Sequence, residues 1–377
     1  MHRLQLHYTL SPDSSPALVR NPLIDLLQAV AQAGSISAAA RAMKLSYRHV
    51  WGELKRWENL LGHELIIWEK GQSARLTEFA NKLMWAEAQA QARLAPQIEA
   101  LRNELERTFA VAFDDGAHMV TLYASHDEAL LHLREWALHL PAGPLHLDIR
   151  FTGSVDAIRA LNEGRCVMAG FHTHSQPAPD SLAAAAYKPL LQPGLHKIIG
   201  FATRMQGLIV ANGNPLDLKS LHDVHRLGLR WANRALGTGT RVLLDEMLRQ
   251  NGLVPADLTG YEHTEPSHTA VAQAVASGSA DAGLGIEAAA RGRGLGFVPL
   301  MQEHYHLVCL KSALQLPGIA ALRELLQSAE WQQKLGAIPG YEAHESGEVV
   351  SLRQRLPWWE FKPGPRKQPS SRDRLLK

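Results

Sequence analysis

The stretch that decides the fold is residues 34–58, GSISAAARAMKLSYRHVWGELKRWE, in which two short helical patterns are separated by a tight turn. Gly34 ends a preceding helical run, and Ser35 or Ser37 can cap the alanine-rich helix that follows. The tripeptide KLS then leads into a longer helix that begins near Ser46. Two helices at this spacing are typical of a helix-turn-helix, whose second helix lies in the major groove of double-stranded DNA.

Polar and basic side chains gather where such a unit would meet DNA. The first turn of the longer helix is expected to face base edges, and the basic residues further along it to lie nearer the phosphates. The candidate DNA contacts are Ser35, Ser37, Ser46, Tyr47, Arg48, His49, Lys55, Arg56, Lys70 and Arg75. The alternative is a small three-helix bundle whose basic residues are only solvated.

Residues 63–80, HELIIWEKGQSARLTEFA, predict a short strand, a glycine turn and a return strand. Such a hairpin after the helices is a wing, with Lys70 and Arg75 near its tip. Residues 20–108 resemble the winged helix-turn-helix of LysR-type regulators and, within that group, most of all the DNA-binding half of ModE-type, molybdate-responsive regulators. This resemblance implies a DNA-binding dimer, with the winged domain over residues 1–77.

Residues 78–110 predict one long linker helix with a continuous apolar seam. Its members recur at three and four and are Phe79, Leu83, Ala86, Ala90, Leu94, Ile98, Leu101 and Leu105. Such a seam is best buried against a second copy, so we expect a homodimer or homotetramer on a palindromic operator. The alternative is packing on the protein's own domain. Pro96 is expected to kink the helix.

From residue 117 to 345 short apolar runs alternate with helical stretches, as in HMVTLYAS, CVMAGFH and IIGFATRMQGLIVA. This alternation predicts an α/β domain with a parallel-rich sheet and helices on both faces. Ligands in such folds lie beyond the carboxyl ends of the strands. The loop NRALGTGTR, residues 233–241, places bare backbone beside positive charge, so Arg234 or Arg241 could hold a small anion at a helix start.

Residues 118–330 resemble the two-lobed type 2 periplasmic-binding-protein fold, and more closely the molybdate-binding-protein-like domain fused to ModE-type DNA-binding domains. The resemblance rests on YASHDEAL, GSVDAIRALNEGRCVMAGFH, NRALGTGTRVLLDEML and SHTAVAQAVASGSADAGLGI. It implies an effector cleft lined by Ser125, His126, Ser154, His172, Arg234, Thr238, Gly239, Thr240, Ser267 and Tyr305. Molybdate, tungstate, the molybdenum cofactor or a carboxylate such as formate remain open as effectors, and family context suggests control of molybdenum-enzyme genes, such as those of a formate dehydrogenase, or of molybdenum-uptake genes.

Two other classes of function compete with this interpretation. A metal sensor could use the paired histidines, which are His172, His174, His263, His268, His304 and His306. An enzyme could use Ser125, His126 and Asp127, but consecutive side chains at a strand end point in different directions, whereas a catalytic triad assembles from distant segments. We therefore expect no enzyme, no metal site and no covalent cofactor.

Composition limits the remaining possibilities. The 377 residues carry a formal net charge of only +2, so DNA binding must come from a local basic patch. The N-terminus lacks a signal pattern and no run is long enough to span a membrane, so a cytoplasmic protein without membrane contact is expected. The two cysteines, Cys166 and Cys309, sit in apolar runs. Residues 346–377 are expected to form a basic, proline-rich tail.

Overall fold

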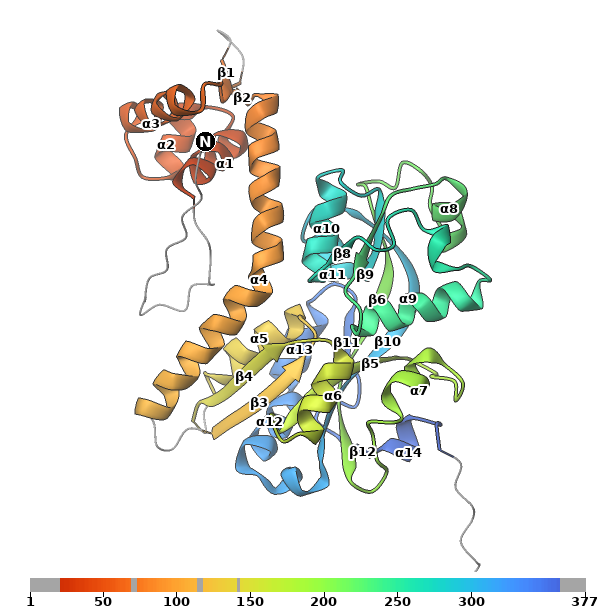
Figure 1. Cartoon of the computed structure of the whole chain (residues 1–377). Coiled ribbons are helices and arrows are strands. Elements are labelled where there is room, and N and C mark those ends of the chain that lie inside the picture. The colour runs from red at the N-terminus through yellow and green to blue at the C-terminus, as the bar shows by residue number, and fades with distance from the viewer. Residues whose placement is uncertain (1–20, 69–72, 114–117, 141–142, 360–377) are drawn as a thin grey trace, which may run out of the picture.

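The computed structural model describes residues 21–68, 73–113, 118–140 and 143–359 (Figure 1). The first described elements form a helical unit. Its core is apolar and includes Leu27, Val30, Val50 and Leu54. The elements are α1 (Pro22–Ala33), α2 (Ile36–Ala42), α3 (Tyr47–Leu61), β1 (Ile66–Ile67) and β2 (Arg75–Leu76).

Local caps explain where these helices begin and end. Ser35 accepts a hydrogen bond from the Ala38 amide, and Ser46 accepts one from the His49 amide, both at 3.1 Å. Gly34 ends α1 in the left-handed conformation with φ of 64°. The expected helix-turn-helix is therefore present, with Ser35 rather than Ser37 as the cap of α2.

The wing is a two-stranded hairpin in which Ile66 pairs with Leu76. Glu58 of α3 is buried and accepts a hydrogen bond from the Leu65 amide at 2.9 Å, so it ties the wing to the helix. The Thr77 hydroxyl donates to the Glu64 carbonyl at 2.8 Å. The predicted contact Lys70 lies outside the described residues.

The long helix α4 (Glu78–Phe113) leaves the wing and changes direction near its middle, where Pro96 lies (Figure 1). It packs against α10 and β4 of its own effector domain. Ala92, which is not a member of the predicted seam, is buried and its carbonyl accepts a hydrogen bond from Ser267 of that domain. The seam residues Ala86 and Ala90 are exposed, so burial of the seam against a second copy stays a prediction. Trp85 and Leu101 are about half exposed.

The second domain is built on one mixed sheet with the order β4-β3-β5-β10-β6-β9-β7-β8. Its two 15-residue strands, β6 and β10, pair along their length and pass through both lobes. The strands are β3 (His118–Ala124), β4 (Leu145–Phe151), β5 (Met168–His174), β6 (His196–Val210), β7 (Trp231–Arg234), β8 (Thr264–Glu265), β9 (Ala282–Ile286), β10 (Gly296–Leu310), β11 (Tyr341–Ala343) and β12 (Val349–Ser351).

The expected parallel pairing holds only within the lobes. Strand β3 is parallel to β4 and β5, and β7 is parallel to β8 and β9. The central strands differ, because β10 is antiparallel to β5 and β6, and β6 is antiparallel to β9. These two strands carry the chain between the lobes, so each must cross in the opposite direction to the other.

Helices surround the sheet, as Figure 1 shows. The largest apolar cluster combines strands of both lobes with α5, α10 and α12 and includes Ile149, Phe201 and Trp331. The helices are α5 (Glu128–Ala137), α6 (Ser154–Asn162), α7 (Leu182–Tyr187), α8 (Leu221–Arg226), α9 (Gly239–Gln250), α10 (His268–Ala276), α11 (Glu287–Arg291), α12 (Pro317–Gln327), α13 (Ala329–Gly336) and α14 (Leu352–Arg355).

In the described part of the chain no single helix is long and apolar enough to cross a membrane. The bent pair α1 and α2 reaches that length and hydropathy only when both are taken together.

The expected tail is shorter than the sequence suggested. Residues 349–351 form β12, which pairs antiparallel with residues 197–199 of β6. Trp358 is buried, with its ring centroid 6.3 Å from that of Tyr187. Residues 346–359 thus belong to the effector domain, because their apolar side chains pack in one buried cluster with side chains of α6, β5 and α7. Residues 360–377 lie outside the described part.

We expect Trp358→Ala to lower the free energy of unfolding of the effector domain by about 3–5 kcal/mol, because it removes a fully packed indole and leaves a cavity. Urea unfolding of the full chain measures this loss. The matched control is Trp359→Ala, since Trp359 is only partly buried. Equal effects of the two substitutions would contradict the burial of this segment.

Candidate effector site

The residues proposed from the sequence come together at the junction of the two lobes. Ser125 and His126 follow β3, His172 lies on β5, and Arg234 ends β7. Arg234 affects the pKa values of His126, His172 and His268, so these groups lie within electrostatic reach of one another. All ten predicted residues are buried.

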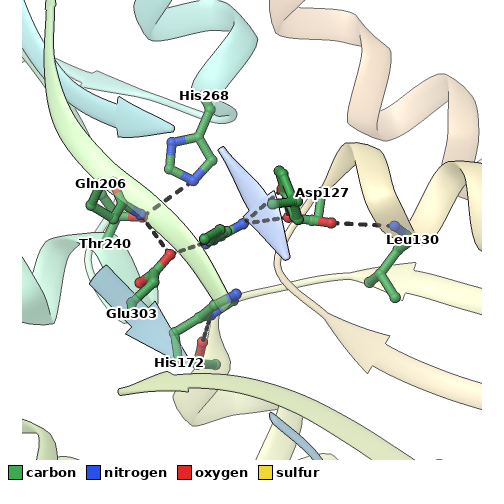
Figure 2. Close-up of polar contacts among 10 residues, drawn as sticks. Asp127, Leu130, His172, Gln206, Thr240, His268 and Glu303 are labelled. Carbon is green, nitrogen blue, oxygen red and sulfur yellow. Dashed lines mark hydrogen bonds and ion pairs between the residues drawn. The ribbon is translucent and has the colours of Figure 1, made fainter. Parts of the chain in front are cut away.

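A buried ion triad that the sequence did not predict occupies the centre of the site (Figure 2). Arg204 of β6 donates from Nε to Glu303 of β10 and from Nη1 to Asp127 at the start of α5. The Tyr341 hydroxyl also donates to the Asp127 carboxylate, at 2.5 Å. The triad therefore joins both crossover strands to the first lobe.

Burial opposes the charges of Arg204 and Glu303 in this triad. It disfavours the Arg204 guanidinium, but the carboxylates of Glu303 and Asp127 outweigh it and hold the pKa of Arg204 well above its ordinary value. Burial raises the pKa of Glu303, and Arg204 opposes that rise. The ion pairs thus hold charges that burial alone would remove.

A chain of polar groups continues from the triad into the second lobe. The Gln206 amide donates to Glu303 Oε1 at 2.9 Å and lies 3.3 Å from Thr240 Oγ1. Thr240 Oγ1 is in turn 3.3 Å from His268 Nε2. Figure 2 shows these four side chains pointing toward one another. Residues from β6, α9, α10 and β10 thus meet at one place.

Among the described residues no carboxylate forms an ion pair with Arg234, although the Glu265 carboxylate attracts it at longer range. The Arg234 Nη1 donates to the main-chain carbonyl of Glu265 at 3.0 Å, while its buried Nε has no hydrogen-bond partner in the same part of the chain. The Glu265 carboxylate binds Arg93 instead. Burial and then repulsion from Arg204 lower the pKa of Arg234 to about 9. An anion beside Nε would relieve both effects.

Further buried polar atoms at the site have no hydrogen-bond partner in the part of the chain that the structure describes. The rings of His172 and Tyr305 lie 4.0 Å apart, and both rings carry such an atom. An unsatisfied buried polar atom costs about 1–3 kcal/mol, so these atoms mark a place where a ligand or water is expected. They are Ser125 Oγ, His172 Nε2, Gln206 Oε1, His268 Nδ1, Glu303 Oε2 and Tyr305 OH.

The histidines of the site are neutral. Burial, and next Arg234, lower the pKa of His126 to about 4. The pKa values of His172 and His268 lie well below the ordinary value, again mainly because of burial. At neutral pH the positive charges of the site are therefore those of Arg204 and Arg234, and Arg204 is already paired with Asp127 and Glu303.

Several predicted ligand residues use their hydroxyl groups in helix caps or in hydrogen bonds within the protein. Thr238 caps α9 and donates to the Ala235 carbonyl at 2.8 Å. Ser267 caps α10 and donates to the Ala92 carbonyl at 3.5 Å. Ser154 Oγ lies 3.4 Å from His172 Nδ1.

Gly239 and Arg241 also shape the site without offering a free group. A Cβ on Gly239 would lie 2.9 Å from His172 Nδ1, so glycine permits this close approach. The Arg241 guanidinium donates to the Tyr261 hydroxyl and to the Arg234 carbonyl. Of the two arginines in the loop, Arg234 is thus the one with an open donor.

The two competing interpretations find little support in this geometry. No three metal-ligating side chains of the described residues gather as a metal site would require. The Asp127 carboxylate is taken by Arg204, by Tyr341 and by the Leu130 amide at 3.2 Å. It is therefore not available to orient His126 as a catalytic triad requires.

The predicted DNA contacts form an exposed face of the helix-turn-helix. The first turn of α3 exposes Tyr47, Arg48 and His49. Exposed side chains are also found at Ser37 of α2 and at Arg75 of the wing. Further along α3, Lys55 pairs with Glu58 at 2.5 Å and Arg56 pairs with Glu53 at 2.7 Å. These two cations must exchange partners to reach a phosphate.

Sequence comparison adds family information to this geometry. Residues 23–81 match the bacterial regulatory helix-turn-helix protein family of lysR type, and residues 137–327 match the PBP superfamily domain. The uncharacterized protein YvgK of Bacillus subtilis (strain 168) is 34% identical over 201 residues, which are 53% of this chain and 64% of that protein. The chain thus spans less than two thirds of this relative.

A second relative is the uncharacterized protein in the ferredoxin 2Fe-2S gene 5'region of Clostridium pasteurianum. It is 34% identical over 111 residues, which are 29% of this chain and 98% of that protein. Among solved structures, full-length BenM is 14% identical with a TM-score of 0.41, covering 84% of this chain and 96% of its own. The domain match covers half of the sequence, and the chain therefore belongs to the PBP superfamily, with a lysR-family helix-turn-helix preceding its PBP domain.

Proposed function

We propose that this chain is a DNA-binding transcriptional regulator, not an enzyme, whose PBP domain binds a small anionic effector. The observation that carries the effector proposal is Arg234, a buried guanidinium that, among the described residues, has no hydrogen-bond partner at Nε and no carboxylate in an ion pair with it. A ligand oxyanion beside Nε would form a charge-assisted hydrogen bond in a dry environment. Ser125 and Tyr305 offer hydroxyls to the same ligand.

The effector we infer is molybdate, tungstate or the molybdenum cofactor, with formate as the alternative small carboxylate. Support for molybdenum comes from the resemblance to ModE-type regulators, and it implies control of molybdenum-enzyme or molybdenum-uptake genes. The unpartnered acceptors Glu303 Oε2 and Gln206 Oε1 favour a ligand that also carries an N–H or O–H group. This favours the cofactor over a bare oxyanion.

The DNA-binding part of the proposal rests on the exposed first turn of α3 and on the lysR-family match. Side chains there can reach base edges in the major groove, while the wing reaches the backbone. The half-exposed Trp85 and Leu101 on α4 support a homodimer or homotetramer, since a second helix would cover them. The effector shifts the balance between two arrangements of this assembly.

We expect isothermal titration of the full chain with molybdate, tungstate, sulfate and formate to show micromolar binding of at least one anion. Arg234→Ala should weaken that binding about 10- to 100-fold, which corresponds to the about 1.5–3 kcal/mol of a hydrogen bond to a charged group.

The matched control is Arg230→Ala on the same stretch of chain. Arg230 is half exposed and pairs with Asp281 at 2.7 Å, so its loss should leave the affinity unchanged. No heat with any of the four anions, followed by binding of a pterin, would move the assignment to the larger cofactor. Equal losses in the two variants would refute the role of Arg234.

We expect Arg48→Ala to weaken binding to the preferred duplex by about 1–3 kcal/mol and to relax sequence preference, because Arg48 is exposed at the first turn of α3. Lys55→Ala should weaken all duplexes alike and reduce the salt slope by about 1. Glu58 keeps its hydrogen bond from Leu65 in that variant, so the fold should persist.

Fluorescence anisotropy on a duplex selected from random sequence, and on a scrambled duplex, measures both effects at several salt concentrations. If Arg48→Ala weakened the two duplexes equally, Arg48 would be a phosphate contact and not a base contact.

A further inference from the structure

Glu265 is placed between two arginines that could each take its carboxylate. It ends β8, and in the parallel pairing of β7 with β8 its Cα stands opposite that of Arg234. Its carboxylate accepts two hydrogen bonds from Arg93 of α4, at 2.9 Å from Nε and 2.7 Å from Nη2. Its main-chain carbonyl accepts from Arg234. The linker helix and the effector site therefore share one residue.

The burial of the Glu265 carboxylate makes its choice of partner energetically important. The Glu265 side chain is 0% exposed, whereas that of Arg93 is 46% exposed. A buried carboxylate that loses its partner is costly, so it must find another cation. Arg234 stands opposite on the neighbouring parallel strand, and neighbouring strands lie about 4.7–4.9 Å apart. His263 Nε2 lies 3.6 Å from Glu265 Oε1, farther than the Arg93 nitrogens that bind the same carboxylate.

We propose that α4 gates the effector site through Glu265. While α4 is docked, Arg93 holds the Glu265 carboxylate and leaves Arg234 free for an anion. When α4 leaves, the carboxylate turns to Arg234 and takes the place of the anion. This inference rests on the proposed function, in which Arg234 binds the effector, and it adds how the linker helix controls that binding.

The docked helix is held at the same place by a second contact. Ser267 donates to the Ala92 carbonyl and caps α10, whose first residue is His268 of the site. Residues 92 and 93 of α4 thus meet residues 265 and 267 directly. Because coupling is reciprocal, an anion on Arg234 must favour the docked helix as much as the docked helix favours the anion.

The first test measures molybdate affinity by titration of the full chain in the wild type and in three variants. We expect Arg93→Gln to weaken binding at least tenfold, because Glu265 then occupies Arg234. Glu265→Gln should keep the wild-type affinity within threefold, and the double variant should behave like Glu265→Gln alone. A merely structural ion pair predicts instead that both single substitutions weaken binding alike and that the double variant does not recover.

The matched control is Lys82→Gln on the same helix, which breaks an exposed ion pair with Glu78. It should leave the affinity unchanged. Arg93→Lys keeps the charge and should recover part of the binding lost in Arg93→Gln. Recovery by neither Arg93→Lys nor the double variant would overturn the proposal.

The second test needs no ligand and so separates this proposal from the identity of the effector. Hydrogen exchange of the amides of residues 264–276 is measured in Arg93→Gln, Arg234→Gln and the double variant. Either arginine can hold Glu265, so the double variant should lose at least tenfold more protection than the product of the single losses. Multiplicative losses would refute the gate, whereas synergy without molybdate binding would leave the gate in place and refute only the effector.

Discussion

The ion triad of Arg204, Asp127 and Glu303 is the interaction on which the rest of the effector domain depends. Arg204 and Glu303 stand opposite each other on the two antiparallel strands that cross between the lobes, and Asp127 begins the first helix of one lobe. Removing either carboxylate would leave the buried charge of Arg204 less compensated, which is costly. The triad therefore fixes how the crossover strands and the first lobe meet.

The positive charge of Arg204 also affects the pKa values of neighbouring groups. Arg204 adds to the burial that keeps His172 and His268 neutral, and it repels Arg234, which forms no ion pair with a carboxylate of the described residues. The site therefore contains one cation paired with carboxylates and one that is not. Under the proposed function, this division would let a site of little net charge bind an anion at one end and a hydrogen-bond donor near Glu303 at the other.

Features that depend on neighbouring residues were predictable from the sequence, and features that depend on pairing between distant strands were not. The helix starts at Ser35 and Ser46 follow from local capping, and the strand ends near Ser125 and Arg234 follow from β/α alternation. The triad required the register of β6 with β10, which no local pattern gives. Trp358 was missed because its burial depends on a distant helix.

The position of Arg93 explains how so small a contact can act on DNA. Thr77 ties the start of α4 to the wing, since its hydroxyl donates to the Glu64 carbonyl and accepts from the Ala80 amide at 3.1 Å. The helix then extends about 24 Å from residue 77 to Arg93. The Arg93 side chain is half exposed, so its ion pair with Glu265 is weaker than a fully buried pair. A ligand whose affinity differs moderately between the docked and undocked states can therefore shift the equilibrium between them. Under the proposed gate, freeing or docking the helix at Arg93 would therefore change the position of the helix-turn-helix at the other end of α4.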